Sequence, residues 1–436
     1  MNKIYFYINK FKIYITNSAW VLLGLIIRTL IVIFIVSKIA NHIGLSDFGW
    51  YNLGISVFTI LYAVSALGFG DTFIIKYFVN GNFSPEEILG TTFISRIISS
   101  IIILLLLTLW ASNFSISNNS WVIVIASLAM IFQSSEVFKA YFQWKLKAKI
   151  YVPVDLFSLI IVAILLIYGL FKGYGLFYFI SVYALERLII LLGLLYCINK
   201  DIRLNRFIFN LKLLKVLLIQ AWPLLLGAIL TALYARFDQV LIKYFLTAED
   251  LGLYGTGIVL CQMWLIIPSL IIPIVFPKIA EFKNLSNKIK YRDTLYMLYG
   301  VLNYLAILII IFIFIFGELI IKYLYGIEYL DSVYILKILI LNLIIQFQSH
   351  LTSSVLIIEN EENYLFKIKL VSVVANVLLN IFLLSVFGVR FAAYSLLISS
   401  IISWVILAYF NKNMLKLMKL NMKSFLLPLH IKKLLK

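Results

Sequence analysis

Long apolar runs recur along the whole chain, and their length limits what it can fold into more than any other feature. The segment 221–280, for example, contains two such runs joined by a short acidic turn at Glu249 and Asp250. A helix that crosses a membrane needs about 20 apolar residues. Hydrophobic residues make up 63% of the chain and charged residues only 13%, and a soluble core could not absorb so much apolar surface. The sequence therefore predicts an all-α, polytopic membrane protein.

The apolar runs predict twelve membrane-spanning helices separated by short polar or basic segments. Loops rich in Lys and Arg stay in the cytoplasm. Placing the N-terminus inside assigns most of the 37 Lys and Arg residues to the cytoplasmic side. We therefore expect a multi-pass protein of the cytoplasmic (inner) membrane with both termini inside. The expected spans are residues 18–39, 48–70, 89–111, 120–142, 152–171, 176–198, 217–241, 252–276, 295–317, 333–358, 366–387 and 391–411.

An internal repeat relates the two halves of the chain. The pattern D-x-G-x-Y-x-x-G begins at Asp47 and recurs 203 positions later at Asp250, and Leu-Leu-Gly ends at Gly24 and again, at the same offset, at Gly227. Two unrelated helical hairpins with similar turns are the alternative interpretation. Six crossings separate the repeats, so both halves have the same orientation. We expect two six-helix lobes related by a pseudo-two-fold axis along the membrane normal.

The repeat and the loop charges divide the chain into four expected regions. The tail lysines Lys412, Lys416, Lys419 and Lys423 recur on one helical face, which indicates a basic amphipathic helix on the anionic inner leaflet. A disordered basic end is the alternative. The regions are an N-terminal lobe at 1–198, a cytoplasmic linker at 199–216, a C-terminal lobe at 217–411 and a cytoplasmic tail at 412–436.

Several cations lie inside the apolar runs, where an ionisable side chain is costly and therefore pairs, faces a cavity or has a function. A planar guanidinium can donate two parallel hydrogen bonds to a phosphate, so these cations indicate an anionic ligand. The alternative is that each arginine is fixed in a structural pair, as Arg187 would be with Glu186 or Asp155. The candidate substrate-binding residues are Arg28, Arg96, Arg187, Arg236 and Lys337.

Carboxylates near these cations could couple transport to a gradient of H⁺ or Na⁺. Glu186 and Asp238 lie within expected spans, and Asp71 lies at the inner end of the expected span 48–70. We assign all three as candidate ion-coupling residues. Glu136 and Lys139 are three positions apart, so they are expected to pair on one helix face.

Other classes of function lack support in the sequence. There is no polar domain to bind nucleic acid, and no nucleophile–base arrangement, phosphate-cradling glycine loop or metal cluster can be recognised. The two cysteines, Cys197 and Cys261, lie in apolar runs and indicate neither a disulfide nor a metal site. We expect no cofactor, and a transporter is favoured over an enzyme.

With these features in view, the chain resembles the polysaccharide (O-antigen, Wzx-type) flippases of the MATE-like MOP exporter superfamily. The resemblance rests on AWPLLLGAILTALYARFDQVLIKYFLTAEDLGLYGTG and IGLSDFGWYNLG, and extends to YGIEYLDSVYILKIL and LLNIFLLSVFGVRFAAYSLLIS. The family's proline–x–glycine–x–x–glycine–alanine run near the last span is incomplete here. At residues 386–393 the proline and the second glycine are absent.

The resemblance implies a substrate and a mechanism. Such proteins move a polyprenyl-pyrophosphate-linked oligosaccharide repeat unit to the outer leaflet by alternating access, for cell-surface polysaccharide or lipopolysaccharide synthesis. It also implies membrane lipids and the polysaccharide polymerase machinery as partners. A cation-coupled multidrug exporter of the same fold, a membrane glycan polymerase or ligase, and a non-transporting assembly factor are the alternatives. An exporter of cations would favour acids in its cavity, and a polymerase would carry a large outer loop.

Overall fold

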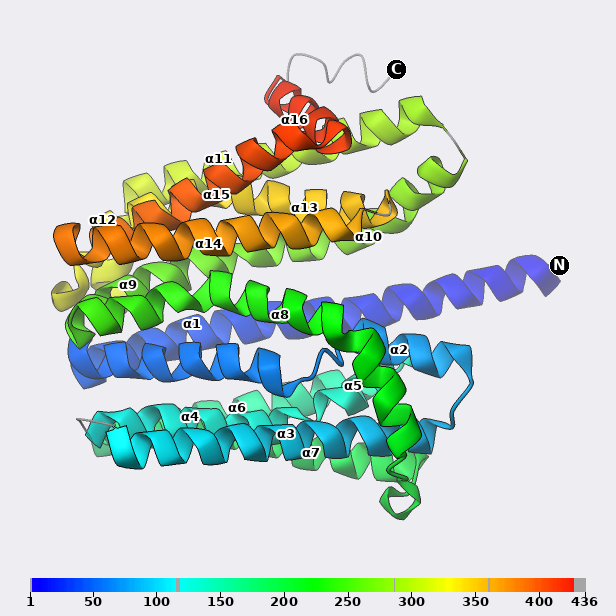
Figure 1. The fold of residues 1–436 in the computed structure, drawn as a ribbon, viewed down its shortest axis with the longest axis horizontal. Coiled ribbons are helices and arrows are strands. Elements are labelled where there is room, and N and C mark those ends of the chain that lie inside the picture. Colours follow the sequence, from blue (N-terminus) through cyan, green and yellow to red (C-terminus); the bar gives the residue numbers. More distant parts are fainter. Residues whose placement is uncertain (1, 115–117, 286, 360, 427–436) are drawn as a thin grey trace. The chain divides into compact units, whose positions relative to one another are not determined.

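The computed structural model describes residues 2–114, 118–285, 287–359 and 361–426, which form helices and no strand (Figure 1). The predicted all-α class is confirmed. The chain divides into two compact units, Met1–Val240 and Leu241–Lys436. The predicted lobes at 1–198 and 217–411 differ from these bounds chiefly in the placement of one helix, and remain a prediction.

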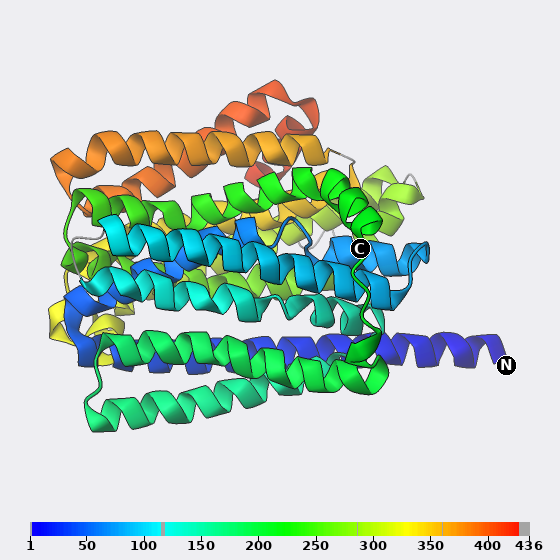
Figure 2. The same ribbon diagram turned by 60° about the horizontal axis from the view of Figure 1, so that its bottom comes forward.

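The first unit contains the helices α1 to α7 and nearly all of α8. Most of them run side by side along one direction, and the start of α1 extends past its neighbours (Figures 1 and 2). The helices are α1 (Asn2–Ser65), α2 (Asp71–Asn80), α3 (Pro85–Phe114), α4 (Trp121–Gln133), α5 (Glu136–Trp144), α6 (Ala148–Lys172), α7 (Leu176–Asp201) and α8 (Leu211–Phe245), with the 3₁₀ turns η1 (Asn118–Ser120) and η2 (Leu204–Arg206).

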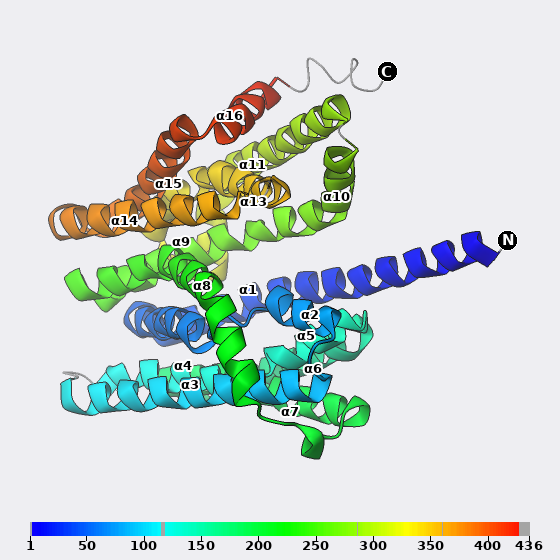
Figure 3. The same ribbon diagram turned by 45° about the vertical axis from the view of Figure 1, so that its right-hand side comes forward.

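The second unit begins within the last turns of α8 and contains eight further helices. α14 packs along α15, and α16 is set at an angle to α15 (Figure 3). The helices are α9 (Ala248–Gln262), α10 (Ile266–Asn284), α11 (Lys288–Leu324), α12 (Ser332–Leu341), α13 (Leu343–Ile358), α14 (Glu362–Phe387), α15 (Arg390–Phe410) and α16 (Lys412–Ser424), with the 3₁₀ turns η3 (Met263–Leu265) and η4 (Ile327–Tyr329).

The first two predicted spans both lie in α1, where a kink at Gly44 separates two helical segments. Gly44 has φ 79° and ψ 173°, a conformation that residues with a Cβ adopt only under strain. The following helical segment carries the first copy of the repeat motif at Asp47. The second copy follows the start of α9, where Thr247 and Asp250 form a capping box. Both copies therefore lie in the first turns of a helical segment.

Ten helical segments in the described part of the chain are long and apolar enough to cross a membrane. The first of them, Trp20–Ser65, contains the break at Gly44, and a shorter apolar helix follows at Arg390–Ile406. Several predicted spans are interrupted. The span 120–142 is divided into α4 and α5, 252–276 into α9, η3 and α10, and 333–358 into α12 and α13. The number twelve remains a prediction.

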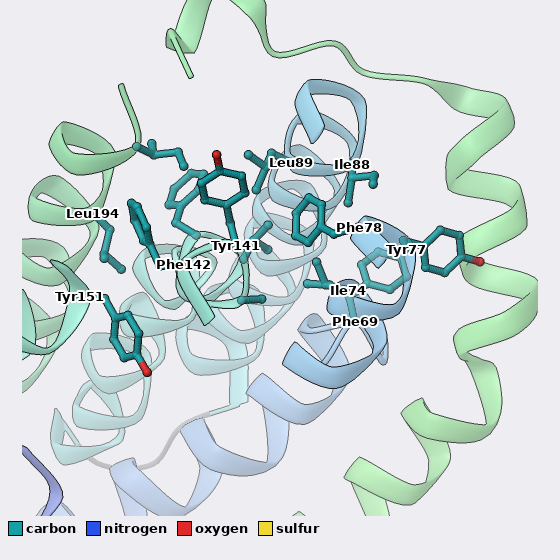
Figure 4. Close-up of a cluster of buried hydrophobic side chains, with 14 of the residues drawn as sticks. Phe69, Ile74, Tyr77, Phe78, Ile88, Leu89, Tyr141, Phe142, Tyr151 and Leu194 are labelled. Carbon is teal, nitrogen blue, oxygen red and sulfur yellow. The ribbon is translucent and has the colours of Figure 1, made fainter. Parts of the chain in front are cut away.

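The helix α2 was not predicted. The predicted span 48–70 ends early, because the helix ends at Ser65 and α2 begins at Asp71. Aromatic side chains on α2, among them Tyr77 and Phe78, enter a buried cluster with Tyr141 and Phe142 of α5 (Figure 4). The cluster also includes Leu213, Leu217 and Ala221 of α8. The first helix of the second sequence half therefore completes the core of the first unit.

The segment between α7 and α8 is fixed on the start of α3. The Nδ2 of Asn210 donates to the Oε1 of Glu87 at 2.9 Å, and its backbone N–H donates to the Oγ1 of Thr91 at 3.0 Å. A Cβ at Gly90 would lie 2.6 Å from the carbonyl oxygen of Ile208, so only glycine permits this approach. The predicted linker is thus a docked segment between residues 202 and 210.

The helix α16 presents a packed face and a basic face. Met414, Leu417, Asn421 and Ser424 are buried against α11 and α15, and the four lysines Lys412, Lys416, Lys419 and Lys423 are exposed. The remaining tail residues, 427–436, lie outside the described part of the chain. The position of this helix on the inner leaflet remains a prediction.

Candidate functional site in the first unit

The first predicted arginine pairs with a predicted coupling carboxylate. The Nη2 of Arg28, on α1, lies 2.5 Å from the Oε1 of Glu186, on α7. The Arg28 side chain is 28% exposed, whereas that of Glu186 is 7% exposed. The carboxylate is thus neutralised by a cation that is itself still accessible from outside the protein.

Arg96, on α3, is 3% exposed and forms a second pair, with the partly exposed Glu136 of α5. Its Nη2 donates to the hydroxyl of Tyr62 at 2.9 Å and lies 3.6 Å from the Oε2 of Glu136. The Tyr62 hydroxyl also donates to Glu136, and the Nε2 of Gln133 donates to the Oε1 of Glu136 at 2.9 Å. Glu136 occupies the first position of α5, immediately after the break between α4 and α5.

Arg187 lies next to Glu186 on α7 and is connected to the second pair through aromatic rings. Its guanidinium carbon lies 5.7 Å from the centroid of the Tyr183 ring. Tyr183 packs edge-on against Phe58 at 5.7 Å, and Phe58 stacks on Tyr62 at 5.9 Å. Contacting aromatic rings thus connect Arg187 with Arg96, and the pair of Arg28 with Glu186 adjoins them because Glu186 precedes Arg187 on α7. This arginine network consists of Arg28, Phe58, Tyr62, Arg96, Gln133, Glu136, Tyr183, Glu186 and Arg187.

Part of this hydrogen-bonding capacity is unused. The Nε and Nη1 of Arg96 and the Nε of Arg187 are buried without a hydrogen-bond partner among the described residues. A buried donor without a partner costs about 1–3 kcal/mol, and more when it is charged. Native proteins seldom tolerate this cost without a reason such as a ligand or a bound water molecule.

The predicted pair of Glu136 with Lys139 is wrong. The Nζ of Lys139 lies 2.7 and 2.8 Å from the two carboxylate oxygens of Asp155, on α6. Glu136 contacts Arg96 instead. Both residues lie in α5, but each is held by a partner on another helix, Lys139 by Asp155 of α6 and Glu136 by Arg96 of α3.

The other two candidate carboxylates have different surroundings. Asp71 begins α2, and the Nε2 of Gln143 donates to its Oδ2 at 3.3 Å. Burial raises the pKa of Asp71, and the charge of Glu136 raises it further, against the opposing effects of Arg96, Gln143 and Lys139. Asp238, on α8, is fully buried, and its Oδ1 accepts the backbone N–H of the next residue at 2.8 Å.

Two predicted cations lie outside the arginine network. Arg236 is a partly buried residue of α8 in the first unit. Lys337 belongs to α12 of the second unit, where its Nζ lies 5.8 Å from the centroid of the Phe314 ring. The five predicted cations thus do not form one cluster within either unit.

Sequence reasoning missed Tyr62 and Tyr183 and assigned Glu136 to a different partner. With 27 tyrosines in the chain, the residue type alone could not single out these two. The only usable signal was the helical spacing of Tyr62 with Phe58 and Ser65. That spacing places them on one face of α1 but does not identify the opposing helix.

Apolar helices long enough to cross a membrane, with ion pairs that connect them, are typical of membrane transporters and flippases. A family model described as "Polysaccharide biosynthesis protein" matches residues 39–334, which is more than half of the chain. The chain therefore belongs to this family. The comparison with curated protein sequences found no significant match.

Solved structures show the same fold. The lipid II flippase MurJ in an inward closed conformation is similar with a TM-score of 0.73 and 14% identity, over 93% of this chain and 90% of that one. An inward-facing multidrug resistance MATE transporter of the MOP superfamily has a TM-score of 0.69 and 12% identity, over 90% and 95%. A MOP superfamily transporter from Pyrococcus furiosus, described as having a binding pocket of reverse polarity, has a TM-score of 0.58 and 12% identity, over 98% and 96%. The predicted polysaccharide family is confirmed by the family model, and these solved structures show the predicted MATE-like fold.

Proposed function

We propose that this protein is a flippase for a polyprenyl-pyrophosphate-linked oligosaccharide and not an enzyme. It would move the repeat unit across the cytoplasmic membrane by alternating access and deliver it to a polysaccharide polymerase for cell-surface polysaccharide or O-antigen synthesis. The family membership supports the polysaccharide connection. The similarity to a lipid II flippase supports a fold able to carry a large lipid-linked substrate.

The observation that carries the proposal is the set of buried guanidinium N–H groups without a partner in the arginine network. A pyrophosphate presents several charged acceptor oxygens, and arginine binds such groups through parallel hydrogen bonds. The network contains three arginines against two glutamates, so it has an excess of positive charge. If alternating access opens a cavity beside the network, Arg96 and Arg187 can satisfy these donors on the pyrophosphate.

The charge excess also bears on the rival of the same fold. A multidrug exporter that carries cationic substrates would be served by a cavity in which carboxylates outnumber cations. The arginine network has the opposite balance, with three arginines and two glutamates among its contacting side chains. This balance favours an anionic substrate.

Substitution of Arg28 tests the proposal. In a deletion strain, Arg28→Ala should leave lipid-linked oligosaccharide trapped in the inner leaflet, while the protein still reaches the membrane. Arg28→Lys should be partly defective, because lysine retains the pair with Glu186 but cannot bind phosphate through two parallel bonds. Arg390→Ala is the matched control, since Arg390 is exposed and stacks on Tyr334 at 4.9 Å. Normal glycan export by Arg28→Ala at matched expression would refute the proposal.

We further propose that Glu186, Asp238 and Asp71 couple flipping to a gradient of H⁺ or Na⁺. Glu186 supports this role best, because its ion-pair partner among the described residues is Arg28, a cation that substrate phosphate could draw away. Transport by the reconstituted protein should respond to a pH or sodium gradient, and Glu186→Gln should remove the response. Transport that is indifferent to both gradients would exclude coupling.

The proposed orientation has both termini in the cytoplasm. A cysteine introduced at position 118 should react with a membrane-impermeant reagent from outside, and one at position 288 only from inside. The reverse pattern at either position would overturn this topology.

A further inference from the structure

The second unit contains a cavity of about 590 Å³ with a strongly basic lining. It lies where the end of α10, the first turns of α11 and the helix α16 meet, next to the end of α13. Four of its lining residues are cations and one is an acid. Its lining residues are Phe282, Lys283, Lys288, Tyr291, Arg292, Leu295, Glu359, Asn413, Lys416, Leu417 and Leu420. We refer to it as the basic cavity.

The single acid of the basic cavity already has partners. Glu359 pairs with the Nζ of Lys283 and accepts a hydrogen bond from the Tyr291 hydroxyl at 2.7 Å. Arg292 contacts the exposed Asp293 at 3.1 Å. Lys288 and Lys416 form no ion pair within the described part of the chain. The cavity thus has positive charge that the protein does not neutralise.

The helix α16 forms a fixed wall of this cavity. The Nδ2 of Asn303, on α11, donates to the Oδ1 of Asn421 at 2.8 Å and to the Oγ of Ser424 at 3.0 Å. At the start of α16, Asn411 and Asn413 donate to the carboxylate of Glu361. Because both ends of the helix are held, Lys416 and Lys288 face the cavity from two different helices without depending on flexible tails.

The position of the basic cavity agrees with the level of lipid headgroups. The helix α11 begins at Lys288, which is also the first residue of a candidate membrane span. Because its 37 residues exceed the ~20 that cross the hydrocarbon, and the predicted span covers only 295–317, its basic first turns are expected at the boundary between water and hydrocarbon. The lining changes from lysines to Leu295, Leu417 and Leu420, so a charged group and an apolar chain can be accommodated together.

We propose that the basic cavity binds the phosphate headgroup of an anionic phospholipid of the inner leaflet. Basic pockets between membrane helices on the cytoplasmic side suit such headgroups. Lys288, Lys416 and Arg292 contact the phosphate, and the leucines contact the first carbons of the acyl chain. A free phosphate ion uses the same cations but gains nothing from the leucines. The bound lipid holds α16 against α11.

The proposal is tested with the full-length protein purified in a mild detergent. Binding of phosphatidylglycerol is measured by native mass spectrometry, with phosphatidylcholine as the zwitterionic lipid and inorganic phosphate as a competitor. The double variant Lys288→Gln/Lys416→Gln should bind phosphatidylglycerol roughly 30-fold more weakly, as two lysines near a headgroup contribute. Both lysines are exposed, so the variant should fold normally.

The matched control is Lys290→Gln/Lys412→Gln, which removes the same charge from the same two helices outside the cavity lining. It should bind phosphatidylglycerol within about 3-fold of the unaltered protein, which corresponds to less than 1 kcal/mol. An equal loss in both double variants would show general charge attraction and overturn the site. Displacement of the lipid by inorganic phosphate, or equal binding of phosphatidylcholine, would overturn the lipid assignment. No glycan carrier enters the assay, so its outcome is independent of the flippase proposal.

Discussion

The two units stabilise their buried polar groups by different means. In the first unit, a buried charged side chain pairs with a partly exposed one, Glu186 with Arg28 and Arg96 with Glu136. In the second unit, neutral amides and hydroxyls satisfy buried polar groups through hydrogen bonds to one another. The Nε2 of Gln348 donates to the Oδ1 of Asn303 at 2.8 Å, and the Oγ of Ser400 donates to the Oδ1 of Asn342 at 2.6 Å. The cations of the basic cavity lie at the end of α10, in the first turns of α11 and on the short helix α16.

This difference shows that equivalent positions in the two halves of the internal repeat carry side chains of different charge. Thr231 occupies the position 203 residues after Arg28, and its hydroxyl donates to the carbonyl oxygen of Gly227 at 2.7 Å. A buried charge costs far more than a buried amide and persists mainly where it has a function. The comparison therefore favours the proposal that the first unit binds the charged group of the substrate. The following predictions test that proposal.

The largest effect is expected from Arg96→Ala in the first unit. Removal of the buried cation takes away the ion-pair partner of Glu136, which keeps only the neutral partners Tyr62 and Gln133, and breaking such a pair costs about 3–5 kcal/mol of the free energy of unfolding. Chemical denaturation in mild detergent measures this loss, and Arg390→Ala provides the exposed control. If both variants unfold at the same denaturant concentration, the Arg96 pair contributes nothing to stability.

A smaller loss is expected from Asn303→Ala in the second unit. The substitution leaves Gln348, Asn421 and Ser424 without a shared partner, at a cost of about 1–3 kcal/mol. Because Asn303 holds α16, limited proteolysis near residue 411 should also become faster. A loss as large as that of Arg96→Ala would contradict the distinction between the two units.

The pair of Arg28 with Glu186 should show a smaller energy of interaction. A double-mutant cycle with Arg28→Ala and Glu186→Gln isolates the interaction, which we expect to be about 1 kcal/mol. The value is modest because 28% of the Arg28 side chain is exposed to solvent or lipid. An interaction energy as large as the loss caused by Arg96→Ala would indicate a permanent structural pair, against a role in substrate binding.

The smallest effect concerns Asp71, whose pKa is raised in the folded protein mainly by burial. A group with a raised pKa contributes stability that is present below its unfolded-state pKa and is lost as the pH rises through its folded-state pKa. The unaltered protein should therefore gain stability on acidification relative to Asp71→Asn. Denaturation at neutral and at acidic pH measures how much more stable Asp71→Asn is than the unaltered protein. This difference in the free energy of unfolding should be larger at neutral pH. An identical difference at both pH values would contradict the raised pKa.

Much of the fold could be predicted because hydrocarbon thickness fixes the length of a spanning helix. The apolar runs gave all the long helices, and the short loops at Lys145 and Gly173 were expected. The break at Ser134 could not be predicted, because serine is compatible with both helix and turn. The helix α2 was also missed, since its ten residues are too few to span a membrane and continue an apolar run.

The candidate site was only partly predictable. The cost of charge in an apolar run identified Arg28, Arg96 and Arg187 without knowledge of any contact. The ion-pair partners of these arginines could not be predicted, because cations on several helices could reach Glu186 or Glu136. Periodicity assigns a residue to a face of its own helix, but pairing across helices depends on how those helices pack.

The placement of α8 has a consequence for biogenesis. The ribosome delivers the first half of the chain before Leu213, Leu217 and Ala221, which complete its core. The newly made first half therefore has an exposed apolar surface until α8 is made and packs against it. We expect a fragment that ends at residue 245 to resist degradation better than one that ends at residue 198. Equal lifetimes of the two fragments in a pulse-chase experiment would show that the newly made half needs no such completion.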